Sequence, residues 1–181
     1  MQRRQRSRDQ LKKYLQGTGI EIGALHKPLA LRGRKVRKVI YVDRLSTEEQ
    51  RSHYPELDNL PLVVPDIIDD GTMLEKVENG SVDFIIANHL LEHLDNHLLA
   101  LENWCKKLKP GGVVYMAIPD KRYTFDKERP VTPLSHLVED YQGSEKMRSQ
   151  RNAAHYVETA EIIEGSVGED ARERVESLVA R

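Results

Sequence analysis

Three short apolar runs, each bounded by turn-forming residues, constrain the fold of this 181-residue chain more than any other feature. The runs are Val36–Val42, Val82–Ala87 and Val113–Ile118, and each is rich in β-branched or aromatic residues. Continuous rather than alternating apolarity is typical of strands in a parallel sheet that is covered on both faces. Two weaker candidates are Gly19–Ile22 and Leu62–Val64. We therefore predict an α/β fold with an open, mainly parallel sheet.

A long helical pattern connects the second and third runs. We predict one helix from about residue 89 to residue 107, with Asn88 as its N-cap. Its apolar side chains fall on one stripe of the helical wheel. The sequence Lys109-Pro110-Gly111-Gly112 then ends the helix and turns the chain into the next strand. A strand, a helix and a second strand in this order predict a βαβ crossover.

The remaining segments read as short helices and loops. Two capping boxes, Ser46-x-x-Glu49 and Ser166-x-x-Glu169, each predict a helix start. We find no strand pattern after Pro119, and we expect a loop over residues 122–133 and a helix over 134–141. We predict one domain over residues 1–142, including a basic leader at 1–16. Residues 143–181 are expected to form a helical C-terminal tail that is not an independent domain.

Composition excludes several classes of protein. The longest apolar run has six residues, from Val113 to Ile118, whereas a membrane-spanning helix needs about 20. The N-terminus lacks the apolar core of a secretory signal peptide. A single cysteine, Cys105, excludes an internal disulfide framework and fits a reducing compartment. We therefore expect a cytoplasmic protein without a membrane span.

The near-neutral total charge hides a strongly basic N-terminal part. Residues 1–38 contain twelve Lys and Arg against two acidic residues, a net charge of +10, and the remaining residues sum to −11. Such a segment could bind phosphate. Proteins that bind single-stranded nucleic acid usually have aromatic residues among the basic ones, and here only Tyr14 is present. We interpret the segment as a solvated leader and do not expect a nucleic-acid partner.

The residues that follow each strand are the best candidates for a binding site, because open parallel sheets bind ligands beyond the carboxyl ends of their strands. Gly23 ends the first candidate strand, and a glycine lets the backbone approach a ligand closely. Asp43 ends the next strand and lies 22 residues after Glu21. This offset is close to the ~20 residues at which an acidic side chain accepts hydrogen bonds from ribose hydroxyls in nucleotide-binding folds.

Two further segments extend this set. Asp66 could accept a hydrogen bond from an adenine amino group while Ile67 covers the ring. Asn88 and His89 follow the second strong strand. Histidines recur at residues 89, 93 and 97, but no cysteine or acidic third ligand accompanies them at a sharp spacing, so we predict no metal site.

The stretch from Glu21 to Pro119 resembles the class I S-adenosylmethionine-dependent methyltransferases. The most specific elements are VDFIIANHLLEHL at 82–94 and LKPGG at 108–112. The resemblance implies a Rossmann-like sheet and S-adenosylmethionine as cofactor. It places the methionine part of the cofactor at Glu21 and Gly23, with Ala24 and His26 nearby. It places the ribose at Asp43, the adenine at Asp66 and Ile67, and the sulfonium and substrate beside Asn88 and His89.

A narrower resemblance concerns the acceptor. Residues 119–126, with Arg129-Pro130 and His136, are similar to a subgroup often associated with surface-glycan biosynthesis. We therefore expect a small-molecule or glycan-type acceptor, which Lys121, Arg122 and Arg129 could hold if it is anionic. The candidate general bases are His89, His136 and Asp120.

The sequence departs from the family pattern in two ways. Leu25 and Lys27 stand where the family loop usually has its second and third glycines. The family's two final strands are not found after Pro119, so the chain could be a C-terminally truncated relative, or a partner could complete the sheet, and a homodimer is possible. Three alternatives stay open: a non-catalytic binding or assembly module, a nicotinamide-dependent oxidoreductase, and a nucleic-acid methyltransferase. The absence of Gly-x-Gly-x-x-Gly disfavours the oxidoreductase.

Overall fold

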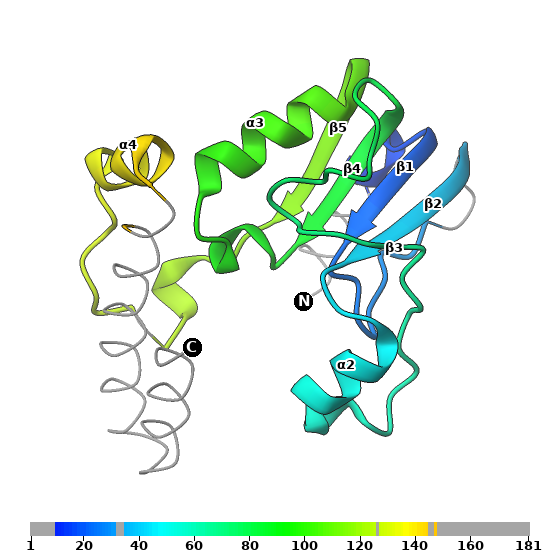
Figure 1. Ribbon diagram of the computed structural model, residues 1–181, viewed down its shortest axis with the longest axis horizontal. Helices are drawn as coiled ribbons and strands as arrows, with labels where there is room; N and C mark the ends of the chain where they lie inside the picture. Colours follow the sequence, from blue (N-terminus) through cyan, green and yellow to red (C-terminus); the bar gives the residue numbers. More distant parts are fainter. Residues whose placement is uncertain (1–9, 32–34, 126, 145–146, 148–181) are drawn as a thin grey trace. The chain divides into compact units, whose positions relative to one another are not determined.

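The computed structural model describes residues 10–31, 35–125, 127–144 and 147 (Figure 1). The chain divides into two compact units. The first contains the residues up to 94 together with residues 99–118, and the second contains residues 95–98 and those from 119 onward. The predicted division at residues 142 and 143 stays a prediction, because nearly all of the tail lies outside the described ranges.

The first unit is built on a parallel sheet of five strands: β1 (Gly17–Ile22), β2 (Val36–Asp43), β3 (Ile67–Ile68), β4 (Val82–Asn88) and β5 (Leu108–Ala117). The strand order is β3-β2-β1-β4-β5, and every neighbouring pair is parallel. The chain therefore builds outward from β1 to β3 and then returns to the other side of β1 (Figure 1). This arrangement confirms the predicted α/β class.

The three strong strand predictions are confirmed, and Gly19–Ile22 lies within β1. The predicted strand at residues 62–64 is wrong. Pro61 and Pro65 flank this segment, and neither has a backbone N–H to donate to a ladder. Val63 N instead donates to Leu25 O (2.7 Å) in the loop after β1. The strand forms two residues beyond the second proline, where Ile67 pairs with Val42 of β2.

The helix predicted from residue 89 to residue 107 is wrong in its first half. Asn88 is the last residue of β4 rather than an N-cap, and α3 spans His97–Lys107. His89 has φ +51°, in the left-handed region, so the chain cannot continue directly into a right-handed helix. A 3₁₀ turn, η3 (Leu91–His93), follows instead. The predicted turn at residues 109–112 lies inside β5, where Gly111 has φ +80° and the pairing with β4 shifts register.

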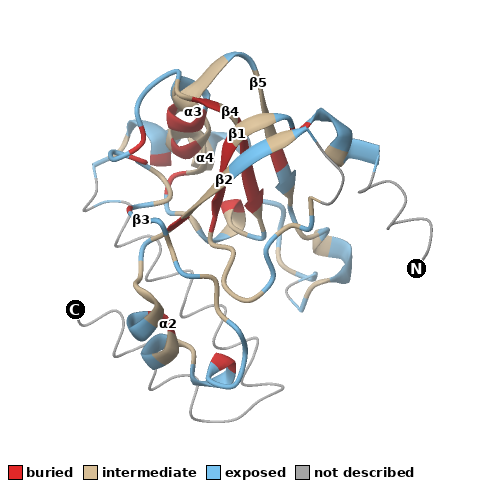
Figure 2. Cartoon of the chain, turned by 90° about the vertical axis from the view of Figure 1, so that its right-hand side faces the viewer, coloured by how far each residue is buried: buried red, intermediate tan, exposed pale blue. Residues whose placement is uncertain are grey.

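The apolar residues of the sheet form two core clusters, one on each face. On one face, the buried Trp104 of α3 packs against Ile20, Ile85 and their neighbours, while Trp104 Nε1 donates to Gly71 O (2.7 Å). Beside it, Asn103 Nδ2 donates to Thr72 O (3.1 Å). On the other face, the buried residues are Leu15, Phe84, Ile86 and Tyr115. Figure 2 shows this buried layer running through the central strands and α3.

Shorter elements connect the strands of the first unit. A 3₁₀ turn, η1 (Lys12–Tyr14), precedes β1, and β2 leads into α2 (Thr47–His53) and η2 (Pro55–Leu57). The capping box predicted at Ser46 is present. Ser46 Oγ accepts from Glu49 N (3.3 Å), and Glu49 Oε2 accepts from Ser46 N (2.8 Å).

The second unit is helical where it is described. It contains the 3₁₀ turn η4 (Lys121–Tyr123), which begins the predicted loop, and α4 (Leu134–Gln142), which confirms the predicted helix. No strand occurs after β5 in the described residues. The capping box at Ser166 and the predicted helices of the tail lie outside the described ranges. Every helix in the described part of the chain is too short or too polar to cross a bilayer.

Gly19 allows β1 and β4 to pair at their observed distance, and its replacement should destabilise the fold. A Cβ atom on Gly19 would lie 2.3 Å from the Phe84 ring, which belongs to the directly paired residue of β4. We expect Gly19→Ala to lower the free energy of unfolding by about 1–3 kcal/mol, the usual cost of overpacking. Urea denaturation measures this loss, and Phe84→Leu in the Gly19→Ala background should recover part of it. An unchanged midpoint for Gly19→Ala would contradict this account.

Candidate functional site

The carboxyl ends of β1, β2 and β4 meet at one edge of the sheet. Strand β1 lies between the other two, with Ile22 paired to Val42 and Glu21 paired to Ile86. The strand order reverses between β1 and β4. Such a reversal opens a crevice beyond the strand ends, which is the usual ligand site of an open α/β sheet.

A buried carboxylate shapes the loop after β1. Glu21 is 2% exposed, and its two carboxylate oxygens accept from Leu29 N at 2.9 and 3.1 Å. Gly23 has φ +67°, which glycine adopts without strain, whereas Leu25 has φ +47° and pays a steric cost. The loop that lacks the family's glycines is therefore held by a side chain at its base and by the Val63–Leu25 backbone bond.

Burial raises the pKa of Glu21 from 4.5 to about 7, although the hydrogen bond from Leu29 N lowers it in part. The carboxyl group therefore changes its protonation near neutral pH while it anchors the loop. Glu21 and Asp66 also act on a neighbour. Burial raises the pKa of Tyr41 above its ordinary value, and these two carboxylates add to that rise.

Asp43 ends β2 and begins a turn that its own side chain stabilises. Its Oδ1 accepts from Leu45 N (3.0 Å), and helix α2 follows from the cap at Ser46. A hollow of about 150 Å³ opens beside this turn. This hollow is shallow and partly open to solvent. The residues that line it are Ala24, Leu25, Tyr41, Val42, Asp43, Gln50, Val63 and Pro65.

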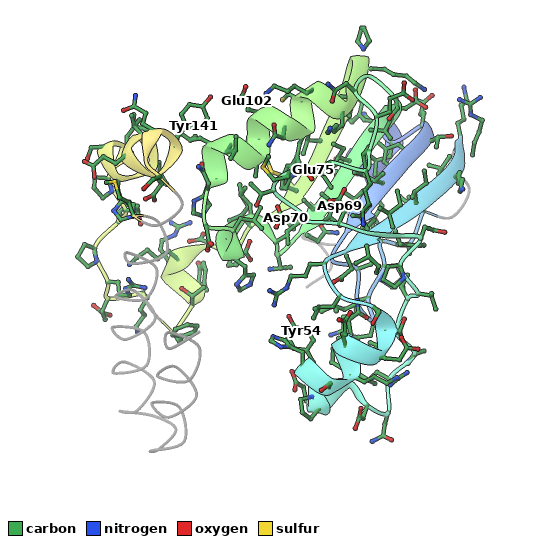
Figure 3. The ribbon with its side chains drawn as sticks, in the orientation of Figure 1. Tyr54, Asp69, Asp70, Glu75, Glu102 and Tyr141 are labelled. Carbon is green, nitrogen blue, oxygen red and sulfur yellow. The ribbon has the colours of Figure 1, made fainter. Side chains whose placement is uncertain are left out.

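Asp66 and Ile67 lie next to the end of β2. Asp66 bonds Tyr41 twice, because its N donates to Tyr41 O and its Oδ2 accepts from Tyr41 N, both at 2.8 Å. Ile67 is half-buried against the core. Farther along, Asp69 and Asp70 (labelled in Figure 3) accept hydrogen bonds from nearby backbone N–H groups, as expected of turn-forming residues.

The end of β4 carries a third polar group. Asn88 is the last residue of the strand, and the His89 side chain is 58% exposed. His89 Nδ1 lies 3.5 Å from Glu92 Oε1. Glu92 stands in the motif at 82–94, but its spacing from His89 does not by itself predict a role for it. The three-residue spacing between His89 and Glu92 does not by itself predict that their side chains approach each other, because this depends on the left-handed backbone conformation of His89.

Buried polar atoms without a hydrogen-bond partner gather at this edge. A buried polar atom is normally paired, so each exception calls for an explanation. In the described residues, all of the following stand in the segments directly after β1, β2 or β4: His26 Nδ1, Thr47 Oγ1, Gln50 Oε1, Asn88 Oδ1 and both carboxylate oxygens of Glu92. Together with Asp43, they form an acceptor-rich edge that fits a ligand with hydroxyl and amino donors, as a nucleoside has.

The other two candidate bases lie in the second unit. His136 Nε2 is 3.2 Å from Asp140 Oδ2, one turn along α4, and Asn96 Nδ2 donates to Asp140 O (2.9 Å). Asp120 caps η4 by accepting from Arg122 N and pairs with the Arg122 guanidinium at 2.6 Å. Their catalytic roles stay predictions, as do the ligand contacts of Glu21, Gly23, Ala24, His26, Asp43, Asp66, Ile67, Asn88 and His89.

A search of the described ranges finds no group of three histidine, cysteine or acidic side chains that could hold a metal ion. His93 lies on the exposed side of η3, away from the regular helical spacing that the sequence suggested.

Comparison with known proteins identifies a family that matches most of the chain. Residues 8–161 match a family described as a methyltransferase domain. A second match is an uncharacterised 37.1 kDa protein in transposon TN4556 of Streptomyces fradiae, which is 32% identical over 104 residues. That alignment covers 58% of this chain and 28% of the relative, so the chain matches little more than a quarter of it.

Solved structures with a similar backbone are more distant. The PH0226 protein from Pyrococcus horikoshii OT3 has 19% identity and a TM-score of 0.47, over 67% of this chain and 56% of that one. The trans-methyltransferase CalH in complex with SAH has 18% identity and a TM-score of 0.40, over 54% of this chain and 30% of that one.

The raised pKa of Glu21 predicts a pH-dependent stability. The unfolded chain ionises Glu21 above about pH 4.5, whereas the folded protein keeps its proton until about pH 7. The folded state binds more protons in this window, so its stability falls as the pH rises through it. Relative to Glu21→Gln, the wild type should lose up to about 3 kcal/mol between pH 4.5 and 7. Urea denaturation of both proteins across this range measures the difference, and a constant difference would refute the prediction.

Proposed function

Since the chain belongs to the family of methyltransferase domains, we propose that it transfers a methyl group to a small-molecule or glycan-type acceptor. S-adenosylmethionine, which the resemblance predicted, is the cofactor of this family. The acceptor class is a proposal drawn from the resemblance of residues 119–136 to the glycan-associated subgroup.

One observation carries the proposal. The unpaired buried polar atoms named above and Asp43 stand at the carboxyl ends of β1, β2 and β4 or in the segments that directly follow them, and the strand order reverses between β1 and β4. A ligand that brings hydroxyl and amino donors to this edge would satisfy atoms that the protein leaves unpaired. Asp43 would accept from the ribose hydroxyls, and Asp66 and Ile67 would border the adenine. Gly23, Ala24 and His26 would border the methionine part, while Glu21 anchors their loop.

The chemistry then requires positioning more than covalent participation by the protein. When bound, S-adenosylmethionine supplies a methyl group on a sulfonium, and the protein orients the acceptor toward it. His89 is the first choice for a general base, because it is exposed at the end of β4 and Glu92 lies 3.5 Å from its imidazole. Asn88 would border the reacting groups. His136 and Asp120 are the alternative bases.

A second candidate function is a non-catalytic module that keeps the fold and serves in binding or assembly. The strained Leu25 and the 150 Å³ hollow favour it, because a loop without its glycines narrows the space at the end of β1. A methyl-transfer assay on a pool of small molecules and glycans separates the two functions.

Pairing between two copies of the chain also remains a proposal. Strand β5 is ten residues long, and within the described residues it pairs only with β4. Met116 and Ile118 are exposed near its end. An open edge of this kind is able to pair with another strand, which supports the predicted homodimer.

Asp43→Asn tests the cofactor site. The substitution keeps the oxygen that accepts from Leu45 N but removes the charge, so the turn should persist while ribose binding weakens. We expect the affinity for S-adenosylhomocysteine to fall at least about tenfold, because a charged hydrogen bond is lost. Isothermal titration calorimetry measures it, with the exposed Asp58→Asn as a matched control. Absence of binding to the wild type would overturn the proposed function.

His89→Asn tests the proposed base. Asparagine tolerates the left-handed backbone at this position, which alanine does not. We expect cofactor affinity to change by less than about twofold and turnover to fall about a hundredfold or more. Transfer of labelled methyl groups to the acceptor pool measures turnover, with the exposed His53→Asn as control. Unchanged turnover would remove His89 from the mechanism.

A further inference from the structure

Helix α2 contains a buried side-chain amide, that of Gln50, to which the proposed function assigns no role. Gln50 is 1% exposed, and its Nε2 donates to Leu45 O (3.4 Å). Its Oε1 is buried and has no hydrogen-bond partner. Exchanging the two ends of the amide would set two carbonyl oxygens against each other, so the carbonyl of Leu45 fixes the orientation. The folded protein therefore holds an unpaired acceptor in place, which is unfavourable in the absence of a ligand.

The position of this acceptor follows from the turn that Asp43 begins. Leu45 N donates to Asp43 Oδ1, and the capping box at Ser46 then starts α2. Gln50 N donates to Ser46 O (2.8 Å), so it belongs to the first turn of the helix. These hydrogen bonds form a continuous series that connects Asp43 to Gln50.

Gln50 and Asp43 also line the same hollow. The rest of its lining is mostly apolar, so these two side chains are its main acceptors. Asp43 Oδ1 is already engaged by Leu45 N, and Oδ2 makes no hydrogen bond in the described part of the chain. Each of these two lining residues therefore has one side-chain oxygen without a hydrogen-bond partner in the described residues. A ribose has two neighbouring hydroxyl donors, which is the number this pair can accept.

We propose that Gln50 Oε1 and Asp43 Oδ2 each accept a hydrogen bond from one hydroxyl of the cofactor ribose. Gln50 is then a binding residue that selects ligands with an intact 2′,3′-diol. This inference rests on the proposed function, because it concerns the same cofactor. It also gives the unpaired amide oxygen its partner.

Gln50→Met tests the assignment, since methionine has a similar shape but no comparable acceptor. We expect the dissociation constant for S-adenosylhomocysteine to rise roughly tenfold. The melting temperature without ligand should change little, because removal of the unpaired buried oxygen offsets the loss of the long 3.4 Å hydrogen bond from Nε2 to Leu45 O. A purely structural glutamine would give the opposite pattern: lower stability and unchanged affinity. The matched control is Gln16→Met, whose Nε2 makes the same 3.4 Å bond to a backbone carbonyl (Lys13 O) but which is exposed.

Analogues of S-adenosylhomocysteine that lack the 2′ or the 3′ hydroxyl test the diol directly. The wild type should bind both more weakly, and Gln50→Met should discriminate against only one of them. The comparison of these analogues on the wild type needs no variant, so it tests the inference even if Gln50→Met folds poorly. Wild-type binding that depends on a single hydroxyl would overturn the inference, as would equal affinity of Gln50→Met and wild type for S-adenosylhomocysteine. If the wild type fails to bind S-adenosylhomocysteine at all, the proposed function falls and this inference with it.

Discussion

The parallel pairing of β1 with both β2 and β4 is the constraint on which the rest of the first unit depends. It brings three strand ends to one edge, so that residues far apart in sequence, such as Gly23 and Asn88, lie at the ends of neighbouring strands. The pairing is possible because Gly19 leaves room for the Phe84 ring of the neighbouring strand. In a parallel sheet the backbone groups of the strands hydrogen-bond to neighbouring strands, whereas the segments that follow the strands lack such partners. Polar atoms in those segments can therefore be buried without a hydrogen-bond partner, and a ligand that binds there can supply the missing partner.

Much of the sheet could be predicted from sequence because its strands are continuous apolar runs, whose burial on two faces leaves a strong signal. The errors have local physical causes. Strand β3 has only two residues, too few for a pattern, and the more apolar segment at 62–64 lies between two prolines. The helix predicted to start at residue 89 fits its leucines well. The helix begins only at residue 97, because His89 adopts a left-handed backbone conformation, and hydrophobic periodicity does not predict the φ angle of a single residue.

The candidate site divides in the same way. Asp43 and Asn88 could be expected from sequence, since each directly follows a strand. Gln50 and Glu92 could not be expected from sequence, because only the structure shows that their side-chain oxygens are buried without hydrogen-bond partners. Glu21 stood in the predicted cofactor loop, but its carboxylate turns inward to Leu29 N. That bond gives a physical account of how a loop with Leu25 and Lys27 in place of glycines keeps a defined shape. A hydrogen bond to the buried Glu21 carboxylate thus fixes the loop, which lacks the flexible glycines of the family pattern.

The hydrogen bonds from α3 to the segment after β3 have a mechanical consequence. Trp104 and Asn103 donate to the carbonyls of Gly71 and Thr72, so α3 holds the connection between β3 and β4, whose Leu74 shares a core cluster with Trp104. The indole bond is buried in the core, where water cannot readily replace it. Breathing of this connection must then be a concerted displacement of helix and connection together, rather than the independent fluctuation of a surface loop. The segment that follows Ile67 and Ile68 is thus fixed to α3 by two side-chain hydrogen bonds, so its position depends on the position of that helix.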